Sequence, residues 1–278
     1  MKTFTGRVGA ITGAASGIGR ALAIDLASRG CHLALSDVDT EGLAETVQRC
    51  EGHGVKVTSQ YVDVADRDAM MAWADAVVAE HGSVNMVFNN AGVAVGYDVA
   101  TMSFEDWDWL IGINLGGVVN GTKAFLPHLE ASGEGHVINI SSVFGLISVP
   151  GQSAYNAAKF AVRGFTDCLR MELDAGGSCV SSTTVHPGGI KTNIARNGRL
   201  DPEATARSGR DPVEGFDRLA RTTPEKAAEV ILGAVERDRR RVVIGADGVV
   251  IDLISRLPGF VYQVPLALAA RRGLKAPA

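Results

Sequence analysis

The chain has 278 residues, a formal net charge of −4 and a pI near 5.9. Apolar residues make up 46% of it, which excludes a disordered chain, and its 33 glycines indicate many tight turns. An acidic balance without a concentrated basic tract excludes a nucleic-acid-binding face. The length fits one large α/β domain or two small ones.

The four cysteines lie far apart and have neither CxxC nor histidine-linked spacing: Cys31, Cys50, Cys168 and Cys179. Free thiols in a reducing compartment are therefore expected, and no metal site is expected. The N-terminus runs directly into an apolar strand without a long apolar leader segment. These features predict a cytoplasmic protein.

A glycine-rich turn follows the first predicted strand, residues 8–12, and precedes a helical pattern. It reads Gly13-Ala14-Ala15-Ser16-Gly17-Ile18-Gly19. Unpaired N–H groups at a helix start favour a pyrophosphate, and side chains at the three glycines would block its approach. An ordinary tight connection is the alternative, because such a turn alone is a weak signal.

The second predicted strand, residues 31–36, ends at Asp37, which is 18 positions after Gly19. That separation is close to the roughly 20 residues at which an acidic side chain binds the adenosine ribose of NAD. A carboxylate repels the 2′-phosphate of NADP, and neither Ser16 nor Val38 adds a basic group, so NAD is the expected cofactor and NADP is less favoured. Alternatively, Asp37 caps the helix that begins near Asp39.

Strands and helices then alternate at the intervals typical of a doubly wound parallel sheet. The predicted ranges are helix 41–50, strand 55–62, helix 66–81 and strand 84–88. Asp63-Val64 follows the third strand, where Asp63 either holds the adenine edge or caps the next helix. Asn89-Asn90-Ala91-Gly92 ends the fourth strand.

Asn114 lies inside a predicted helix, residues 103–129. Asparagine is a poor residue in mid-helix because its amide competes for backbone groups. It is either a tolerated exposed position or the site of a kink or a bound water.

Tyr155 and Lys159 share one face of a predicted helix because they are four residues apart. A phenol has a pKa of about 10 in water, and a nearby ammonium lowers it, although such a pair also arises by chance. Ser141 and Ser142 end the preceding strand, residues 136–140, where open α/β sheets bind ligands. The spacing to Tyr155 favours Ser142.

The sixth predicted strand, residues 181–185, is followed by His186-Pro187-Gly188-Gly189-Ile190-Lys191-Thr192. The backbone of this turn either meets a nicotinamide carboxamide or only starts a loop.

Taken together, these motifs resemble the short-chain dehydrogenase/reductase family over residues 6–192. The matching elements are Thr12-Gly13-x-x-x-Gly17-Ile18-Gly19, Asn89-Asn90-Ala91-Gly92, Asn114, Ser142, Tyr155-x-x-x-Lys159 and Pro187-Gly188. The resemblance implies an α/β fold: a single Rossmann-type doubly wound domain with a seven-stranded parallel sheet. It also implies a homodimer or homotetramer that assembles through the fourth and fifth helices.

The resemblance also implies a role for each matching residue. Tyr155 is the expected general acid/base, and Lys159 is expected to lower its pKa and to bind the nicotinamide ribose. Ser142 orients the substrate oxygen, and Asn114 kinks its helix and holds a water for proton relay. The expected cofactor-binding residues are Gly13, Ser16, Gly17, Ile18, Gly19, Asp37, Asp63, Val64, Asn90, Ala91, Gly92, Tyr155, Lys159, Pro187, Gly188, Ile190 and Thr192.

The predicted domain covers residues 1–246, with a helix at 224–237 and a last strand at 242–244. Residues 194–223 resemble a substrate lid, whose arginines are offset by acidic neighbours as in a solvated loop. Residues 247–278 form a C-terminal apolar extension expected to pack on the same domain. It is too short and interrupted to span a bilayer, and it covers the lid or a subunit interface or contacts a membrane surface.

The sequence therefore predicts an NAD-dependent oxidoreductase that transfers a hydride between a hydrophobic secondary alcohol or ketone and the nicotinamide. The apolar segment 143–149 and the apolar extension favour a hydrophobic substrate. One alternative is an NADPH-dependent carbonyl or 3-oxoacyl reductase. Another is a dinucleotide-binding protein without turnover, which would have no need for Tyr155 and Lys159 together.

Overall fold

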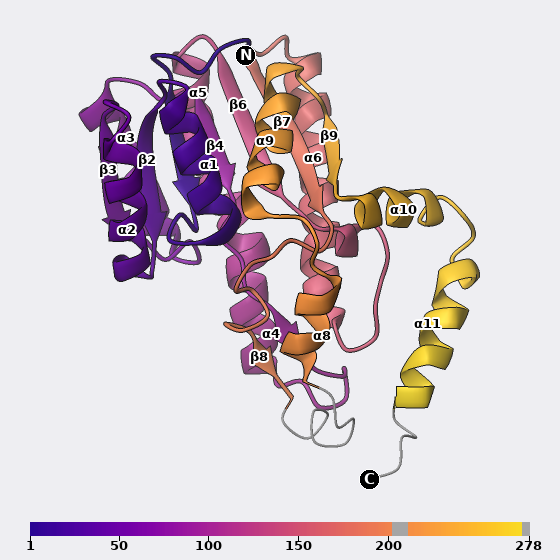
Figure 1. The fold of residues 1–278 in the computed structure, drawn as a ribbon. Coiled ribbons are helices and arrows are strands. Elements are labelled where there is room, and N and C mark those ends of the chain that lie inside the picture. The colour runs from indigo at the N-terminus through magenta and orange to yellow at the C-terminus, as the bar shows by residue number, and fades with distance from the viewer. Residues whose placement is uncertain (202–210, 274–278) are drawn as a thin grey trace.

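The computed structural model describes residues 1–201 and 211–273 of the chain. Its centre is a sheet of seven parallel strands, as predicted, and their order is β3-β2-β1-β4-β6-β7-β9 (Figure 1). The strands are β1 (Val8–Thr12), β2 (His32–Asp37), β3 (Val57–Tyr61), β4 (Met86–Asn89), β6 (Gly135–Ile140), β7 (Val180–Pro187) and β9 (Arg241–Ile244). Every residue of β1, β4 and β6 is buried, as expected of parallel strands covered on both faces.

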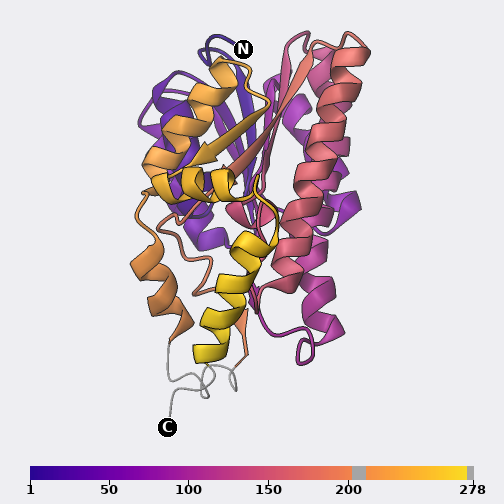
Figure 2. The same cartoon turned by 90° about the vertical axis from the view of Figure 1, so that its right-hand side faces the viewer.

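Helices cover both faces of the sheet (Figure 2). One layer contains α1 (Gly17–Ser28), α2 (Thr40–Glu51) and α9 (Pro224–Glu236), and α1 contacts both of the others. The other contains α3 (Arg67–His81), α5 (Gly117–Ala131) and α6 (Ser153–Ala175). Trp73 of α3 packs edge-on against Phe125 of α5, with ring centroids 5.1 Å apart. These two layers hold the sheet between two apolar cores.

The sheet reverses its winding direction between β1 and β4. The chain passes from β1 outward to β2 and β3, and then returns to place β4 on the other side of β1. In open parallel sheets, ligands bind outside the carboxyl ends of the strands at such a reversal. The segments that follow β1 and β4 therefore lie at the expected position for a ligand.

The predicted helix at 103–129 is interrupted. The structure contains α4 (Phe104–Ile111), a π-helical turn η1 (Gly112–Gly116) and then α5. Asn114 lies within η1, and such single π-turns locally distort a helix. Of the two interpretations of Asn114, the structure selects the kink over the exposed position, because the residue is fully buried.

The predicted lid contains regular structure. Two residues, Arg199–Leu200, form β8, which pairs in parallel with β5 (Val95–Gly96), and α8 (Pro212–Leu219) follows. These parts of the lid are therefore a short strand and a helix and not a loop, while Arg196 and Arg199 are paired with acidic residues as expected. Residues 202–210 of the predicted lid lie outside the described residues.

The C-terminal extension consists of two helices. The first, α10 (Ala246–Ile254), contacts β9 and the 3-10 turn η2 (Val143–Gly145). The second, α11 (Phe260–Gly273), lies apart from the sheet and its covering helices (Figure 1). Residues 274–278 lie outside the described residues. Across the described residues, the helices are all too short or too polar to cross a bilayer.

Candidate active site

The glycine turn after β1 is shaped by backbone conformations that favour glycine. Gly13 and Gly17 have φ angles of 65° and 53°, and a Cβ on Gly19 would lie 2.1 Å from the Gly13 carbonyl oxygen. Ser16 is the N-cap of α1, but its side chain makes no capping hydrogen bond and no acidic residue lies in the first turn. The start of α1 therefore presents free N–H groups with the positive end of the helix dipole, which fits a pyrophosphate.

Asp37 lies beside this turn at the end of β2. Its Oδ2 accepts a hydrogen bond from the Ala15 N–H at 2.8 Å, and its Oδ1 accepts from the Asp39 N–H at 3.0 Å. The cap of α2 is Asp39, whose carboxylate accepts from the Gly42 N–H. The interpretation of Asp37 as the helix cap is therefore wrong, and its carboxylate borders the predicted cofactor site.

Asp63 also does not cap a helix. Its Oδ1 accepts from the Ala65 N–H at 2.9 Å in a tight turn, whereas Asp66 caps α3. The neighbouring Val64 is held by its carbonyl oxygen, which accepts from the Asn120 side chain at 3.0 Å. This turn lies after β3, on the β2 side of the winding reversal.

The Asn89–Gly92 segment is tied to the glycine turn. The Asn90 amide donates to the carbonyl oxygens of Thr12 and Gly13, at 2.9 and 3.1 Å. The Thr12 hydroxyl in turn accepts from the N–H groups of Asn90 and Ala91. These bonds join the ends of β1 and β4, so the two predicted cofactor-binding segments form one surface.

The same segment reaches the predicted catalytic residues. A Cβ on Gly92 would lie 3.3 Å from the Asn114 Oδ1 and 3.6 Å from the Lys159 Nζ. The Asn114 side chain both donates to and accepts from the Val93 backbone, at 2.9 and 2.8 Å. Lys159 is buried, and its ammonium donates to the Ile140 carbonyl oxygen at 2.9 Å. Asn114 and Lys159 are thus fixed beside Gly92.

The two serines after β6 have different surroundings. The Ser141 hydroxyl donates to the Lys159 carbonyl oxygen at 2.8 Å and is directed into α6. The Ser142 hydroxyl accepts from the Phe144 N–H at 3.1 Å and lies near the Tyr155 phenol. Ser142 is therefore the serine that meets Tyr155, in line with the spacing along the chain.

The ionisation of Tyr155 and Lys159 is governed by burial. Burial raises the pKa of Tyr155 to about 12, and the Ser142 hydroxyl acts in the opposite direction. Burial lowers the pKa of Lys159 to about 8. The predicted lowering of the Tyr155 pKa by Lys159 is not found in this structure, because the ammonium donates to Ile140 and lies 5.5 Å from the phenol ring centre.

The Pro187-Gly188 segment ends β7 rather than forming a free turn. The Gly188 N–H donates to the Ile244 carbonyl oxygen at 2.9 Å, so this donor is already used. Ile190 is buried, and Thr192 lies against the glycine turn: a Cβ on Gly17 would be 3.0 Å from the Thr192 methyl carbon. The segment thus borders the glycine turn, as Asp37 does.

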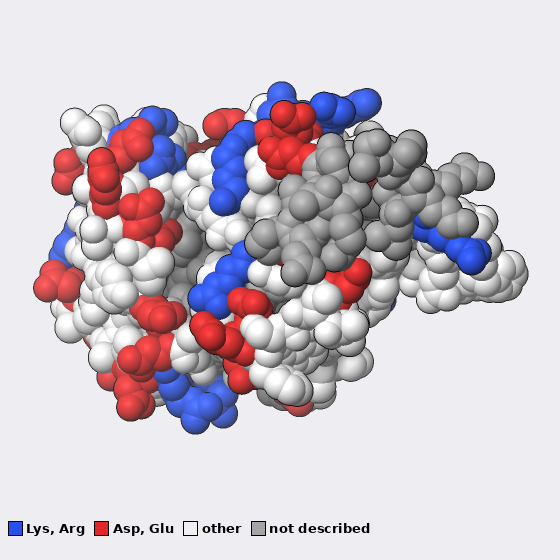
Figure 3. Space-filling view, turned by 90° about the horizontal axis from the view of Figure 1, so that it is seen from below, with Lys and Arg blue, Asp and Glu red and all other residues white. Residues whose placement is uncertain are grey.

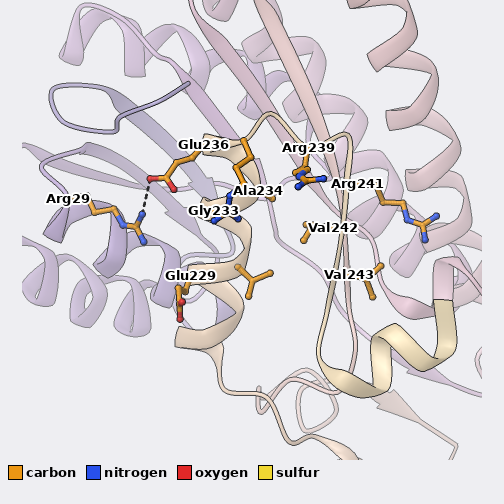
Figure 4. Close-up of a pocket in the computed structure, with 11 residues that line it drawn as sticks. Arg29, Glu229, Gly233, Ala234, Glu236, Arg239, Arg241, Val242 and Val243 are labelled. Atoms are coloured by element: carbon orange, nitrogen blue, oxygen red, sulfur yellow. Dashed lines mark hydrogen bonds and ion pairs between the residues drawn. The ribbon is translucent and has the colours of Figure 1, made fainter. Parts of the chain in front are cut away.

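A separate cleft of about 550 Å³ lies between α9 and β9, near the end of α1 (Figure 4). It is lined by several arginines, but Arg29 is ion-paired with Glu236 at 3.2 Å and Arg241 is ion-paired with Asp252. Arg29 and Arg241 lie at opposite ends of the cleft in Figure 4. Two of its four arginines are thus paired with carboxylates, and the cleft lies away from the glycine turn.

Comparisons with known proteins identify the family. The model of the short chain dehydrogenase family matches residues 7–203, more than half of the chain. The chain belongs to the short-chain dehydrogenase/reductase family. It is 53% identical over 267 residues to the putative oxidoreductase SadH of Mycobacterium tuberculosis, covering 95% of each chain.

Two further relatives extend this comparison. The chain is 35% identical to the 3-oxoacyl-acyl-carrier-protein reductase FabG of Thermotoga maritima, covering 87% of this chain and 97% of that one. It also resembles a crystal structure of a short-chain dehydrogenase/reductase from Burkholderia phymatum in complex with NAD. That structure has a TM-score of 0.83 and 32% identity, and the match covers 100% of this chain and 99% of that one.

Two residues of this short-chain dehydrogenase/reductase contact the site but were missed in the sequence. His186 is fully buried, and its Nδ1 donates to the Ser142 carbonyl oxygen at 2.8 Å. Burial lowers the His186 pKa to about 4, so the ring is neutral. Asp247 of α10 accepts from the Gly189 N–H at 2.7 Å. In the sequence, the only indication that His186 belongs to the site was its position directly before Pro187.

Proposed function

We propose that this protein is an NAD-dependent oxidoreductase that transfers a hydride between a hydrophobic secondary alcohol or ketone and the nicotinamide. One observation carries the proposal: Asn114, Ser142, Tyr155 and Lys159 meet at the carboxyl edge of the sheet, next to the glycine turn. Four residues from three separate segments of the chain converge there, which supports catalysis over a chance tyrosine–lysine pair.

The residues around the turn fit a dinucleotide. The N–H groups at the start of α1 would hold the pyrophosphate, and Asp37 would hold the adenosine ribose. Asn90–Gly92 and Thr192 border the same surface. When bound, the nicotinamide supplies the hydride acceptor or donor.

The protein's own groups would move the proton. Tyr155 exchanges a proton with the substrate oxygen, while the Ser142 hydroxyl stabilises charge on that oxygen. With a pKa of about 12, the phenol is protonated at neutral pH, which is the form that donates to a ketone oxygen. Taking a proton from an alcohol requires the Lys159 charge closer to the phenol oxygen, because an adjacent cation favours the phenolate.

Asp37 supports NAD over NADP. Its carboxylate lies beside the glycine turn, where it would repel a 2′-phosphate. Arg20 is a nearby cation on α1, but it is ion-paired with Glu45 at 2.8 Å and bonded to Thr46. The second candidate, an NADPH-dependent 3-oxoacyl reductase, is favoured by the 35% identity to FabG and opposed by Asp37.

A hydrophobic substrate is supported by the surroundings of Tyr155. Its ring packs with an apolar cluster that includes Val95, Leu110 and Trp109. Two arginines of the lid are engaged with acidic groups, in the pairs Arg196–Asp217 and Arg199–Asp106. They therefore offer little to an anionic substrate.

We further infer a homodimer or homotetramer that assembles through α5 and α6. Exposed Phe160 and the small exposed residues Ala157 and Gly164 on α6 leave room for a second copy to pack closely. The buried thiols of Cys31 and Cys50 are unpaired, which supports a reducing, cytoplasmic location.

The test is the melting temperature of the protein with NADH and with NADPH at equal concentrations. A ligand that binds only the folded state stabilises it by about 2.7 kcal/mol at a hundred times its dissociation constant. We expect the larger shift with NADH, and an Asp37→Ala variant is expected to lose this preference. A larger shift with NADPH would overturn the assignment of NAD, and no shift with either would overturn the proposal that the site binds a nicotinamide dinucleotide.

A further inference from the structure

The two C-terminal helices carry an unusual share of the exposed apolar side chains. Half of the sixteen exposed large apolar side chains of the described residues lie within residues 249–268. They are Val249, Val250, Leu253, Leu257, Phe260, Val261, Val264 and Leu268, here called the C-terminal apolar surface. The other eight are scattered over the chain. A concentration of exposed apolar side chains marks an interaction site, whereas single exposed apolar residues do not.

The surface projects from the body of the protein. α10 rests on β9 and η2, while α11 stands clear of the sheet and of its covering helices (Figure 1). Within α11, Phe260, Val264 and Leu268 are four residues apart and form one stripe along the helix. All three are more than half exposed, so the described part of the chain leaves the stripe uncovered.

The charge of the chain changes sign after Asp252 of α10, which is ion-paired with Arg256 at 2.8 Å. Residues 253–278 contain four basic residues, Arg256, Arg271, Arg272 and Lys275, and no acidic residue. Residues 1–252 contain 23 basic and 31 acidic residues. In the view from below, the lobe that projects at the right shows blue but no red (Figure 3). Along the sequence, basic residues thus flank the α11 stripe on both sides.

We propose that the C-terminal apolar surface docks on an anionic lipid bilayer. A helix of 14 residues is about 21 Å long, which is too short to span the hydrocarbon core but suited to lie in its surface. Apolar side chains enter the acyl boundary while the flanking arginines meet anionic headgroups. Pairing of α11 with α11 of a second copy is disfavoured, because it would bring two basic segments together.

Docking would hold the candidate active site at the bilayer. α10 contacts η2, which begins directly after Ser142, and Asp247 binds the Gly189 N–H. The carboxyl edge of the sheet would then lie near the phase in which apolar alcohols partition. The lipid binding itself does not depend on the proposed oxidoreductase activity.

The test is co-sedimentation of the full-length protein with vesicles. One set contains equal parts of phosphatidylcholine and phosphatidylglycerol, and the other contains phosphatidylcholine alone. We expect binding to the anionic vesicles, at least ten-fold weaker binding to the neutral ones, and weakening at high salt, which screens the arginines. Equal binding to both sets or none to the anionic set would overturn the proposal.

Variants locate the contact. Phe260→Glu with Leu268→Glu is expected to weaken binding more than ten-fold, because it replaces two apolar side chains of the stripe with charges that cannot enter the acyl boundary. Arg271→Gln, at an exposed arginine of α11, should weaken it about five-fold. The matched control is Phe104→Glu, at a residue 88% exposed on α4, which should bind as the unchanged protein does.

Two further readouts distinguish lipid docking from self-association and from loss of folding. Melting curves confirm that each variant is folded, and turnover of a water-soluble alcohol without vesicles reports the proposed function independently. Light scattering measures the oligomer. If the Phe260 and Leu268 variant dissociated an oligomer and the unchanged protein did not bind vesicles, the surface would be an interface between copies and the proposal would be wrong. Loss of binding in Phe104→Glu would also contradict it.

Discussion

The carboxyl edge of the sheet and the C-terminal helices depart from the usual distribution of side chains in opposite ways. At the carboxyl edge, polar side chains are buried: Asn114 and His186 are fully covered and Lys159 is 3% exposed. On the C-terminal helices, apolar side chains are exposed, with Phe260 at 66% and Leu253 at 60%. Buried polar groups and exposed apolar patches are the informative exceptions in a folded protein.

The two regions also differ in how firmly they are held. Each of these buried polar side chains at the carboxyl edge bonds to backbone from another segment, as Asn114 does to Val93 and His186 to Ser142. Among the described residues, α11 forms no comparable packing against another helix or strand. The difference indicates that the carboxyl edge is organised to bind a small ligand in a fixed geometry. The C-terminal helices are suited to contact with an extended surface.

The largest expected effect is on kcat, which should depend on the carboxyl edge of the sheet and not on the C-terminal helices. Tyr155→Phe removes the proposed acid/base group and is expected to lower kcat by about 10²–10⁴-fold. Cofactor binding and melting temperature should stay nearly unchanged, since the ring and its contact with Phe144 remain. Phe260→Glu should leave kcat for a water-soluble alcohol unchanged. Steady-state kinetics with both variants checks this. Full activity in Tyr155→Phe would show that Tyr155 is not the acid/base group.

The next effect tests the glycine turn. Gly19→Ala would place a Cβ 2.1 Å from the Gly13 carbonyl oxygen, so the backbone must shift. We expect a loss of about 1–3 kcal/mol in the free energy of unfolding and weaker NADH binding. Gly52→Ala is the control, because it has an ordinary φ of −60° and no neighbour within 4 Å. Equal denaturant midpoints for the two variants would show that the turn is not tightly packed.

Much of the fold could be predicted because its signals are local. The parallel strands are buried apolar runs, so β1 was located to the residue, and Asp66 marks the start of α3 by capping it. A kink was one of the expectations for Asn114, but its form as a π-turn and the hydrogen bond of Asn114 to Val93, 21 residues away, could not be predicted from a local pattern. Likewise, the apolar residues of α11 look the same in sequence whether the helix is covered or exposed.

The motifs predicted which residues form the site and their order along the chain. They did not predict the pKa values of those residues. The sequence led to the expectation that Lys159 lowers the Tyr155 pKa, whereas burial raises that pKa to about 12. Burial is set by the packing of α6 on β6, β7 and η2, which no local pattern records. His186 was missed for the same reason, since its partner Ser142 is 44 residues away.

Acid is expected to destabilise the carboxyl edge through His186. Its folded pKa of about 4 lies below the ordinary value of 6.5, so between these values the unfolded chain binds a proton that the folded protein excludes. The free energy of unfolding should therefore fall as the pH drops from about 6.5 to 4, by up to about 1.4 kcal/mol per pH unit. Denaturant unfolding at several pH values measures this slope.

The control for this slope is His186→Asn, whose amide nitrogen can replace the Nδ1 donor without titrating. We expect a shallower slope for this variant over the same range, with the contribution of buried His136 remaining. Helix α11 should add nothing, because residues 253–278 contain no acidic residue and no histidine. Identical slopes for the variant and the unchanged protein would contradict the role of His186.

The smallest effect is expected on the C-terminal helices in lipid-free buffer. Leu268 is 51% exposed, so Leu268→Ser should change the free energy of unfolding by no more than about 0.5 kcal/mol. Leu26→Ala, on the buried face of α1, should lower the free energy of unfolding by about 2–5 kcal/mol. Denaturant unfolding of both variants in dilute solution makes the comparison. A loss above about 1 kcal/mol for Leu268→Ser would mean that α11 is covered by protein in solution, and the exposed surface that sets the two regions apart would then be an interface between copies.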